Sequence, residues 1–174
     1  MRRASTELLE QGIQAPSPAP DHIPAEHQPR TYIRIGTRNG GTSFPTIWTQ
    51  MDSAANDGLV FAIDEVYREL EKKDDAAFQW LKARRVMVVA IDTAIQQHVA
   101  AILAAHPRLI DTRKNRSLGD PFVIGLARAR GFSVITGERP SGVIAKPHIP
   151  DVCAALGITC MNVLSMFRNE GWRA

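Results

Sequence analysis

The chain has 174 residues, of which 44% are hydrophobic and 22% are charged, with a formal net charge of +3. This length and composition are those of a globular domain that can bury a sizeable core. Only two cysteines occur, Cys153 and Cys160, which excludes a disulfide-stapled secreted scaffold and indicates reduced core thiols. No apolar run approaches the ~18 residues of a membrane span. We therefore expect a cytoplasmic protein without a membrane partner.

The first thirty residues differ in composition from the rest of the chain. The run Gln14–Pro20 holds three prolines among small and polar residues. Such a segment cannot bury a core or sustain a helix. We expect residues 1–30 to form a disordered, proline-rich extension and residues 31–174 to form a single domain.

Beyond this extension, helical and strand patterns alternate. Short apolar runs predict strands at 59–63, 86–90, 132–136 and 158–161, and 32–35 could form another. Apolar spacing and capping residues predict helices, caps included, at 46–56, 64–73, 92–105, 120–130, 149–157 and 162–170. Another helix is predicted to run to Ala83 with either Asp74 or Asp75 as its cap. The alternation predicts an α/β fold in three layers, with helices on both faces of a mainly parallel central sheet. Ligands bind such sheets outside the carboxyl ends of the strands.

Two acids are predicted to reach that edge together. The helix after Asp120 travels about 15 Å at ~1.5 Å per residue. The following strand, 132–136, returns about 16 Å at ~3.3 Å per residue. Asp120 and Glu138 should therefore meet the same edge of the sheet. The alternatives are that Asp120 is only the N-cap before Pro121 and that Glu138 is an ordinary turn residue.

Further acids follow the strand 59–63. Asp64, Glu65 and Glu69 lie in the next predicted helix, where Glu65 and Glu69 share a face. Carboxylates that converge from separate elements suit Mg²⁺ or Mn²⁺ rather than zinc. The five histidines show no metal-ligand spacing. The alternative is a solvated helix face whose acids pair with Arg68 and the lysines after it.

A basic excess surrounds the downstream acids. Residues 108–146 carry eight basic side chains and three acidic ones. This balance suits a polyanionic substrate held near a metal. A solvated, arginine-rich surface is the alternative.

Several segments resemble a known family. Gly119–Ala127 and Gly131–Glu138 are similar to the third-acid helix and the fourth-acid strand of PIN domains, the VapC-like toxin ribonucleases. Pro45–Trp48, Phe61–Leu70 and 149–158 resemble one PIN-like branch that is catalogued as a domain of unknown function. The resemblance covers roughly residues 44–172. It implies a PIN-like fold and an endoribonuclease that uses Mg²⁺ or Mn²⁺ to cut RNA, with an antitoxin or a second copy of the chain as protein partner.

The resemblance also implies site residues. Glu69 matches the family's second acid, Asp120 the third and Glu138 the fourth, so these three are the expected catalytic and metal-binding residues. Glu65 is the other candidate for the second position. The side chains expected to contact RNA phosphates are Arg113, Lys114 and Arg116.

One part of the family pattern is missing. PIN domains place their first metal-binding Asp after the first strand, but no carboxylate occurs between Arg30 and Asp52. Either the chain is an inactive paralogue, or an altered start or reading frame makes residues 1–43 non-native. The two functions that follow are a ribonuclease impaired by the missing Asp, and a catalytically inactive PIN-like module that binds RNA or protein. An unrelated phosphatase-like or receiver-like domain would require the same absent Asp.

Overall fold

The computed structural model describes residues 31–33, 45–110, 118–143 and 145–172, and every structural statement below refers to these residues. The predicted extension at 1–30 lies outside them. So do the three side chains expected to contact RNA, which are Arg113, Lys114 and Arg116.

The described residues form one five-stranded sheet in which every pairing is parallel. Its strands are β1 (Thr31–Ile33), β2 (Val60–Ile63), β3 (Val88–Val89), β4 (Ser133–Ile135) and β5 (Cys160–Met161). The order across the sheet is β3-β2-β1-β4-β5. The predicted α/β fold with a parallel sheet is confirmed. Its central strand is β1, where Tyr32 lies opposite Phe61 of β2 and Val134 of β4.

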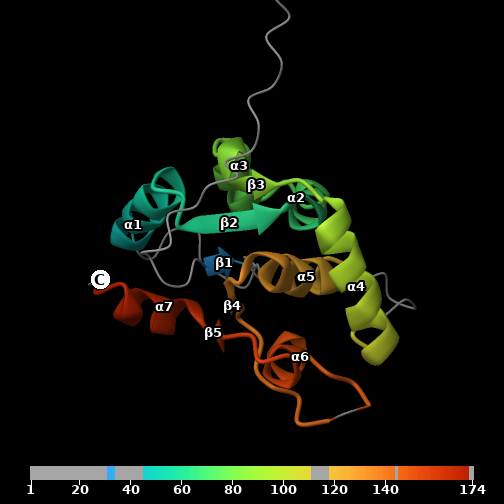
Figure 1. The fold of residues 1–174 in the computed structure, drawn as a ribbon. Helices are drawn as coiled ribbons and strands as arrows, with labels where there is room; N and C mark the ends of the chain where they lie inside the picture. The colour runs from blue at the N-terminus through green and yellow to red at the C-terminus, as the bar shows by residue number, and fades with distance from the viewer. Residues whose placement is uncertain (1–30, 34–44, 111–117, 144, 173–174) are drawn as a thin grey trace, which may run out of the picture.

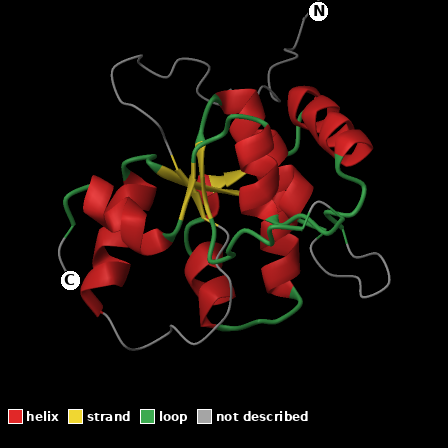
Figure 2. Cartoon of the chain, turned by 90° about the horizontal axis from the view of Figure 1, so that it is seen from below, coloured by secondary structure: helices red, strands yellow, loops and turns green. Residues whose placement is uncertain are grey.

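Helices cover both faces of this sheet, as Figures 1 and 2 show. They are α1 (Pro45–Asn56), α2 (Asp64–Glu71), α3 (Ala76–Lys82), α4 (Thr93–Ala105), α5 (Asp120–Arg130), α6 (Ile149–Ala155) and α7 (Val163–Asn169). Right-handed crossovers between parallel strands place α1, α2 and α3 on one face and α4, α5 and α6 on the other. The contacts agree, because α5 packs against α4 and α6 and lies over β2 and β4. None of the described helices has the length and apolar character needed to cross a membrane.

Local sequence signals account for the helix boundaries. Asp75, Asp92 and Asn162 each precede a helix, and their side chains accept hydrogen bonds from amides of its first turn at 2.8–3.1 Å. These bonds satisfy amides that have no partner inside the helix. At the other end of α5, Gly131 takes a left-handed conformation with φ of 69°, which a residue without a Cβ adopts without strain.

The strand predicted at 86–90 is largely wrong. Arg85–Met87 form a 3₁₀ turn, and only Val88 and Val89 pair with β2. Met87 is buried, whereas Val86 is 84% exposed. The continuous apolar run suggested a strand covered on both faces, but Val88 and Val89 are only partly buried, and β2 is the single neighbour of β3 among the described strands.

Candidate carboxylate site at the sheet edge

The order in which the chain adds strands to the sheet reverses at the central strand, β1. The chain leaves β1 for β2 on one side and later returns to β4 on the other. Open α/β sheets bind ligands at the carboxyl ends of the strands where the order reverses in this way. The residues that follow β1 in the sequence, 34–44, contain no carboxylate and lie outside the described residues. Any acid at this edge must therefore come from the other elements.

Two of the predicted acids are brought together there. Glu69 Oε1, on α2, accepts a hydrogen bond of 2.8 Å from the amide of Gly119. Gly119 immediately precedes Asp120, the first residue of α5, whose side chain is only 2% exposed. A Cβ added to Gly119 would lie 3.2 Å from Glu69 Oε2. A glycine at this position thus lets the Glu69 carboxylate approach the backbone beside Asp120.

The position of Asp120 differs from that of a simple cap. Gly119 occupies the cap position, and its carbonyl accepts the amides of Phe122 and Val123 at 3.1 and 3.0 Å. Asp120 lies inside the first turn instead. The positive end of the helix dipole stabilises a carboxylate in that turn. Burial makes this carboxylate unusual, because buried charges in proteins are paired or bind a metal.

Glu65, the other candidate for the second acid, faces a different environment. Its Oε2 lies 3.3 Å from Nη1 of Arg68, and Arg68 also contacts Asp64 at 2.7 Å. The Arg68 side chain is 57% exposed. Glu65 therefore belongs to an ion-pair group within α2, in which the arginine is exposed and the acids are partly buried, whereas Glu69 bonds the residue before α5.

Glu138 lies three residues beyond β4 at the same edge. Its amide donates to Thr136 Oγ1 at 3.1 Å. Its Oε2 accepts a hydrogen bond of 3.2 Å from the amide of Ile149, the first residue of α6. Among the described residues, no group of three or more His, Cys, Asp or Glu side chains could hold a metal ion. Glu69 contacts the residue next to Asp120, while the Glu138 carboxylate binds α6.

Asp151, which is not among the predicted site residues, anchors the loop behind Glu138. Asp151 accepts hydrogen bonds from the amides of Ser141 and His148, both at 2.8 Å, and of Gly142 at 3.4 Å. The bond from Ser141 contributes most to lowering the pKa of Asp151 to about 2. Asp151 is the third residue of a helix, where an acid often bonds back to the capping amide. That position was the signal available in the sequence.

The two cysteines also meet behind this edge. Cys153 is fully buried in α6, and Cys160 is half-buried in β5. A hydrogen bond between the two thiols raises the pKa of Cys153, and burial adds to the effect. The same bond lowers the pKa of Cys160. Both cysteines are free, and the predicted core position holds fully for Cys153.

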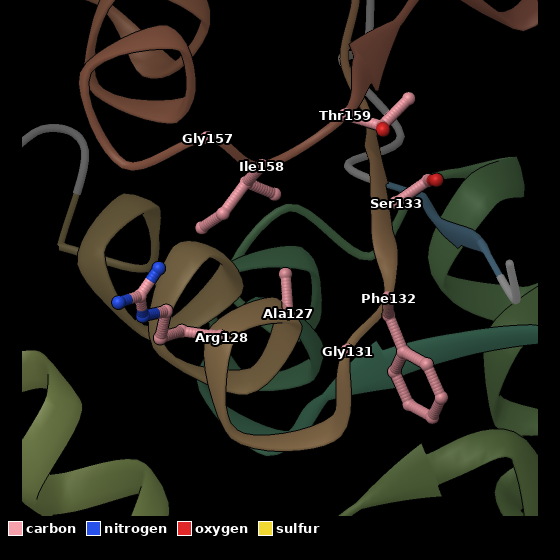
Figure 3. A pocket seen from close by; sticks show the side chains of 8 residues that line it. All are labelled: Ala127, Arg128, Gly131, Phe132, Ser133, Gly157, Ile158 and Thr159. Atoms are coloured by element: carbon pink, nitrogen blue, oxygen red, sulfur yellow. The ribbon is translucent and has the colours of Figure 1, made fainter.

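A cavity of about 260 Å³ lies at the opposite, amino-terminal end of β4 and β5. Figure 3 shows it between the last turn of α5 and the segment that leads into β5, with Ala127 and Ile158 toward its centre. The remaining lining residues are Arg128, Gly131, Phe132, Ser133, Gly157 and Thr159. Arg128 Nη1 already donates to the Leu156 carbonyl at 2.8 Å. This cavity is therefore separate from the predicted site, none of whose residues lines it.

The fold and the two acids Glu69 and Asp120 define an α/β protein with acidic residues near the carboxyl ends of its strands. A family model described as "Domain of unknown function (DUF4411)" matches residues 39–174, and the chain belongs to this family. The strand β1 lies before the matched region. No curated protein and no solved structure matches the chain. The family description names no activity, so the PIN resemblance stays a prediction.

Proposed function

We propose that the chain is a PIN-like ribonuclease that hydrolyses RNA phosphodiesters with Mg²⁺ or Mn²⁺, and that Glu69 and Asp120 form the centre of its site. The observation that supports this proposal is the hydrogen bond from the Gly119 amide to Glu69, which places the Glu69 carboxylate against the residue that precedes the buried Asp120. The two acids come from helices that right-handed crossovers put on opposite faces of the sheet, at the edge where sheets of this kind bind ligands.

The chemical type of the ligand atoms is compatible with Mg²⁺. Carboxylate oxygens are hard ligands, and Mg²⁺ is commonly bound by one or two carboxylates together with substrate phosphates and water. Glu69 and Asp120 would supply these two carboxylates. A bound ion would lower the pKa of a water molecule and stabilise charge on the phosphodiester. Glu138 would join only if its carboxylate moved closer to the other two acids, because the described residues form no group of three.

The second candidate is a catalytically inactive module of the same fold that binds RNA or protein. Two observations favour it. The central strand β1 is followed in the sequence by no carboxylate before Asp52. The acids Glu69, Asp120 and Glu138 do not form a three-ligand group among the described residues. A metal site that lacks part of its ligand set should bind its ion weakly.

Under the first proposal, RNA is the substrate and the protein works in the cytoplasm. A cognate antitoxin or a second copy of the chain would be its protein partner. The basic window 108–146 supports RNA, because eight basic side chains against three acids attract a polyanion.

RNA cleavage by matched variants tests the proposal. Asp120→Asn keeps the shape of the side chain and removes its charge. With Mg²⁺ or Mn²⁺ present, we expect the cleavage rate to fall by more than about 100-fold, since the loss of even an outer partner of a metal ligand costs about 10–100-fold. Glu65→Gln is the control, because Glu65 lies on the same helix as Glu69 but pairs with Arg68. Equal cleavage by wild type and Asp120→Asn would refute the assignment.

Calorimetric titration with Mg²⁺ or Mn²⁺ separates the two candidates. The ribonuclease proposal predicts binding heat in the wild type that Asp120→Asn and Glu69→Gln both diminish. The binding-module alternative predicts no metal heat, no cleavage, and RNA retention that a chelator leaves unchanged.

A further inference from the structure

The turn between α6 and β5 joins two contacting elements that each carry a cysteine. Gly157, with φ of 66°, reverses the chain after the helix. The amide of Ile158 then donates to the carbonyl of Cys153 at 2.9 Å. This bond holds the segment that leads into β5 against α6, and the strand that carries Cys160 contacts the helix that carries Cys153. The turn between the two cysteines is short, and the interaction between their thiols is the largest cause of the shift in each pKa.

The two thiols differ in access to solvent. Cys153 is 0% exposed and belongs to the hydrophobic core. Cys160 is partly exposed and packs against the edge of that core. A thiol that solvent can reach reacts with an oxidant first, and a second thiol in contact with it can then displace the oxidised oxygen. The pair thus has one member suited to each step.

We propose that Cys153 and Cys160 form a reversible intramolecular disulfide when the protein meets a hydroperoxide. The Cys160 sulfur attacks the peroxide O–O bond, so that a sulfenic acid forms and water, for hydrogen peroxide, leaves with the thiol proton. The Cys153 sulfur then attacks the Cys160 sulfur, the S–O bond breaks, and a second water leaves with the Cys153 proton. Both sulfurs are oxidised and one peroxide is reduced. A dithiol reagent reverses the change.

The bond would lie next to the loop that carries Glu138. Ile149, which donates its amide to Glu138, and Cys153 are one helical turn apart on α6. The disulfide would tie this helix covalently to β5. The proposal does not depend on ribonuclease activity, and its test does not measure cleavage.

The experiment exposes the reduced full-length chain to hydrogen peroxide, then unfolds it in iodoacetamide and measures its mass and peptides. The expected result is a chain that has lost two hydrogens, takes up no iodoacetamide, and regains both alkylation sites after treatment with dithiothreitol. In Cys153→Ser, Cys160 should stop at a sulfenic acid that dimedone traps. In Cys160→Ser, the buried Cys153 should remain alkylatable.

Three results would overturn the proposal. They are two alkylatable thiols after peroxide, a sulfinic acid at Cys160 beside an intact Cys153, and a disulfide-linked dimer on a non-reducing gel. Circular dichroism of each serine variant checks that it folds, and the wild-type result decides the question even if a variant does not.

Discussion

The contact between α4 and α5 depends on the absence of a side chain at Gly125. A Cβ built at this position would lie 2.7 Å from Cγ2 of Val99 and 3.3 Å from the carbonyl oxygen of Ile95. Val99 is β-branched and has one strongly preferred rotamer in a helix, so its methyl group cannot turn away cheaply. The Ile95 oxygen is backbone and moves only with α4. Gly125→Ala should therefore push the two helices apart.

The magnitude follows from two opposing effects. Overpacking a well-packed core costs typically about 1–3 kcal/mol, while replacing a helical glycine by alanine gains roughly 1 kcal/mol. We expect a net loss of about 1 kcal/mol in the free energy of unfolding, at the middle of this range. Urea denaturation followed by circular dichroism measures it as a lower midpoint with an unchanged slope.

A double-mutant cycle isolates the cause. Val99→Ala removes the methyl group that the new Cβ meets most closely, while the contact with the Ile95 oxygen remains, so Gly125→Ala should destabilise the protein less in that background than in the wild type. Gly137→Ala is the matched control, because a Cβ there meets nothing within 4 Å. Two results would refute the steric explanation. One is a Gly125→Ala protein that is as stable as the wild type, and the other is an equal loss of stability in the wild-type and Val99→Ala backgrounds.

Two further predictions concern acids that bind backbone amides. Asp75→Ala should lower the unfolding free energy by about 1 kcal/mol, because the side chain caps α3 through two hydrogen bonds of 3.1 Å, and urea denaturation measures this. Asp151→Asn should remove part of the acid sensitivity of the fold. The pKa of Asp151 is about 2, below its ordinary 3.8, so the stability it contributes is complete above pH 4 and is lost as the pH falls through 2. Between pH 5 and pH 2, the melting temperature should fall less in Asp151→Asn than in the wild type. Parallel plots of melting temperature against pH for the two proteins would contradict the link between the pKa of Asp151 and stability.

The sequence by itself determined where most elements begin and end. Asp75, Asp92 and Asn162 cap their helices, and Gly131 ends α5, as their positions predicted. These signals are local, because a cap bonds amides only two or three residues away. The alternation of helices and strands likewise implied a parallel sheet, since parallel strands need crossover connections.

Only the tertiary structure decided which acids meet. Glu65 and Glu69 share a helix face in the sequence, yet Glu65 pairs with Arg68 and Glu69 reaches Gly119, fifty residues away. Which of the two acids reaches Gly119 depends on how α2 is rotated relative to α5. The periodicity of apolar residues within one helix does not encode this rotation. The place of β1 at the sheet centre, the short β3 and the bond from Ile149 to Glu138 also arise from contacts between distant segments. The sequence could name the acids, whereas their grouping required the packing of helices on both faces of the sheet.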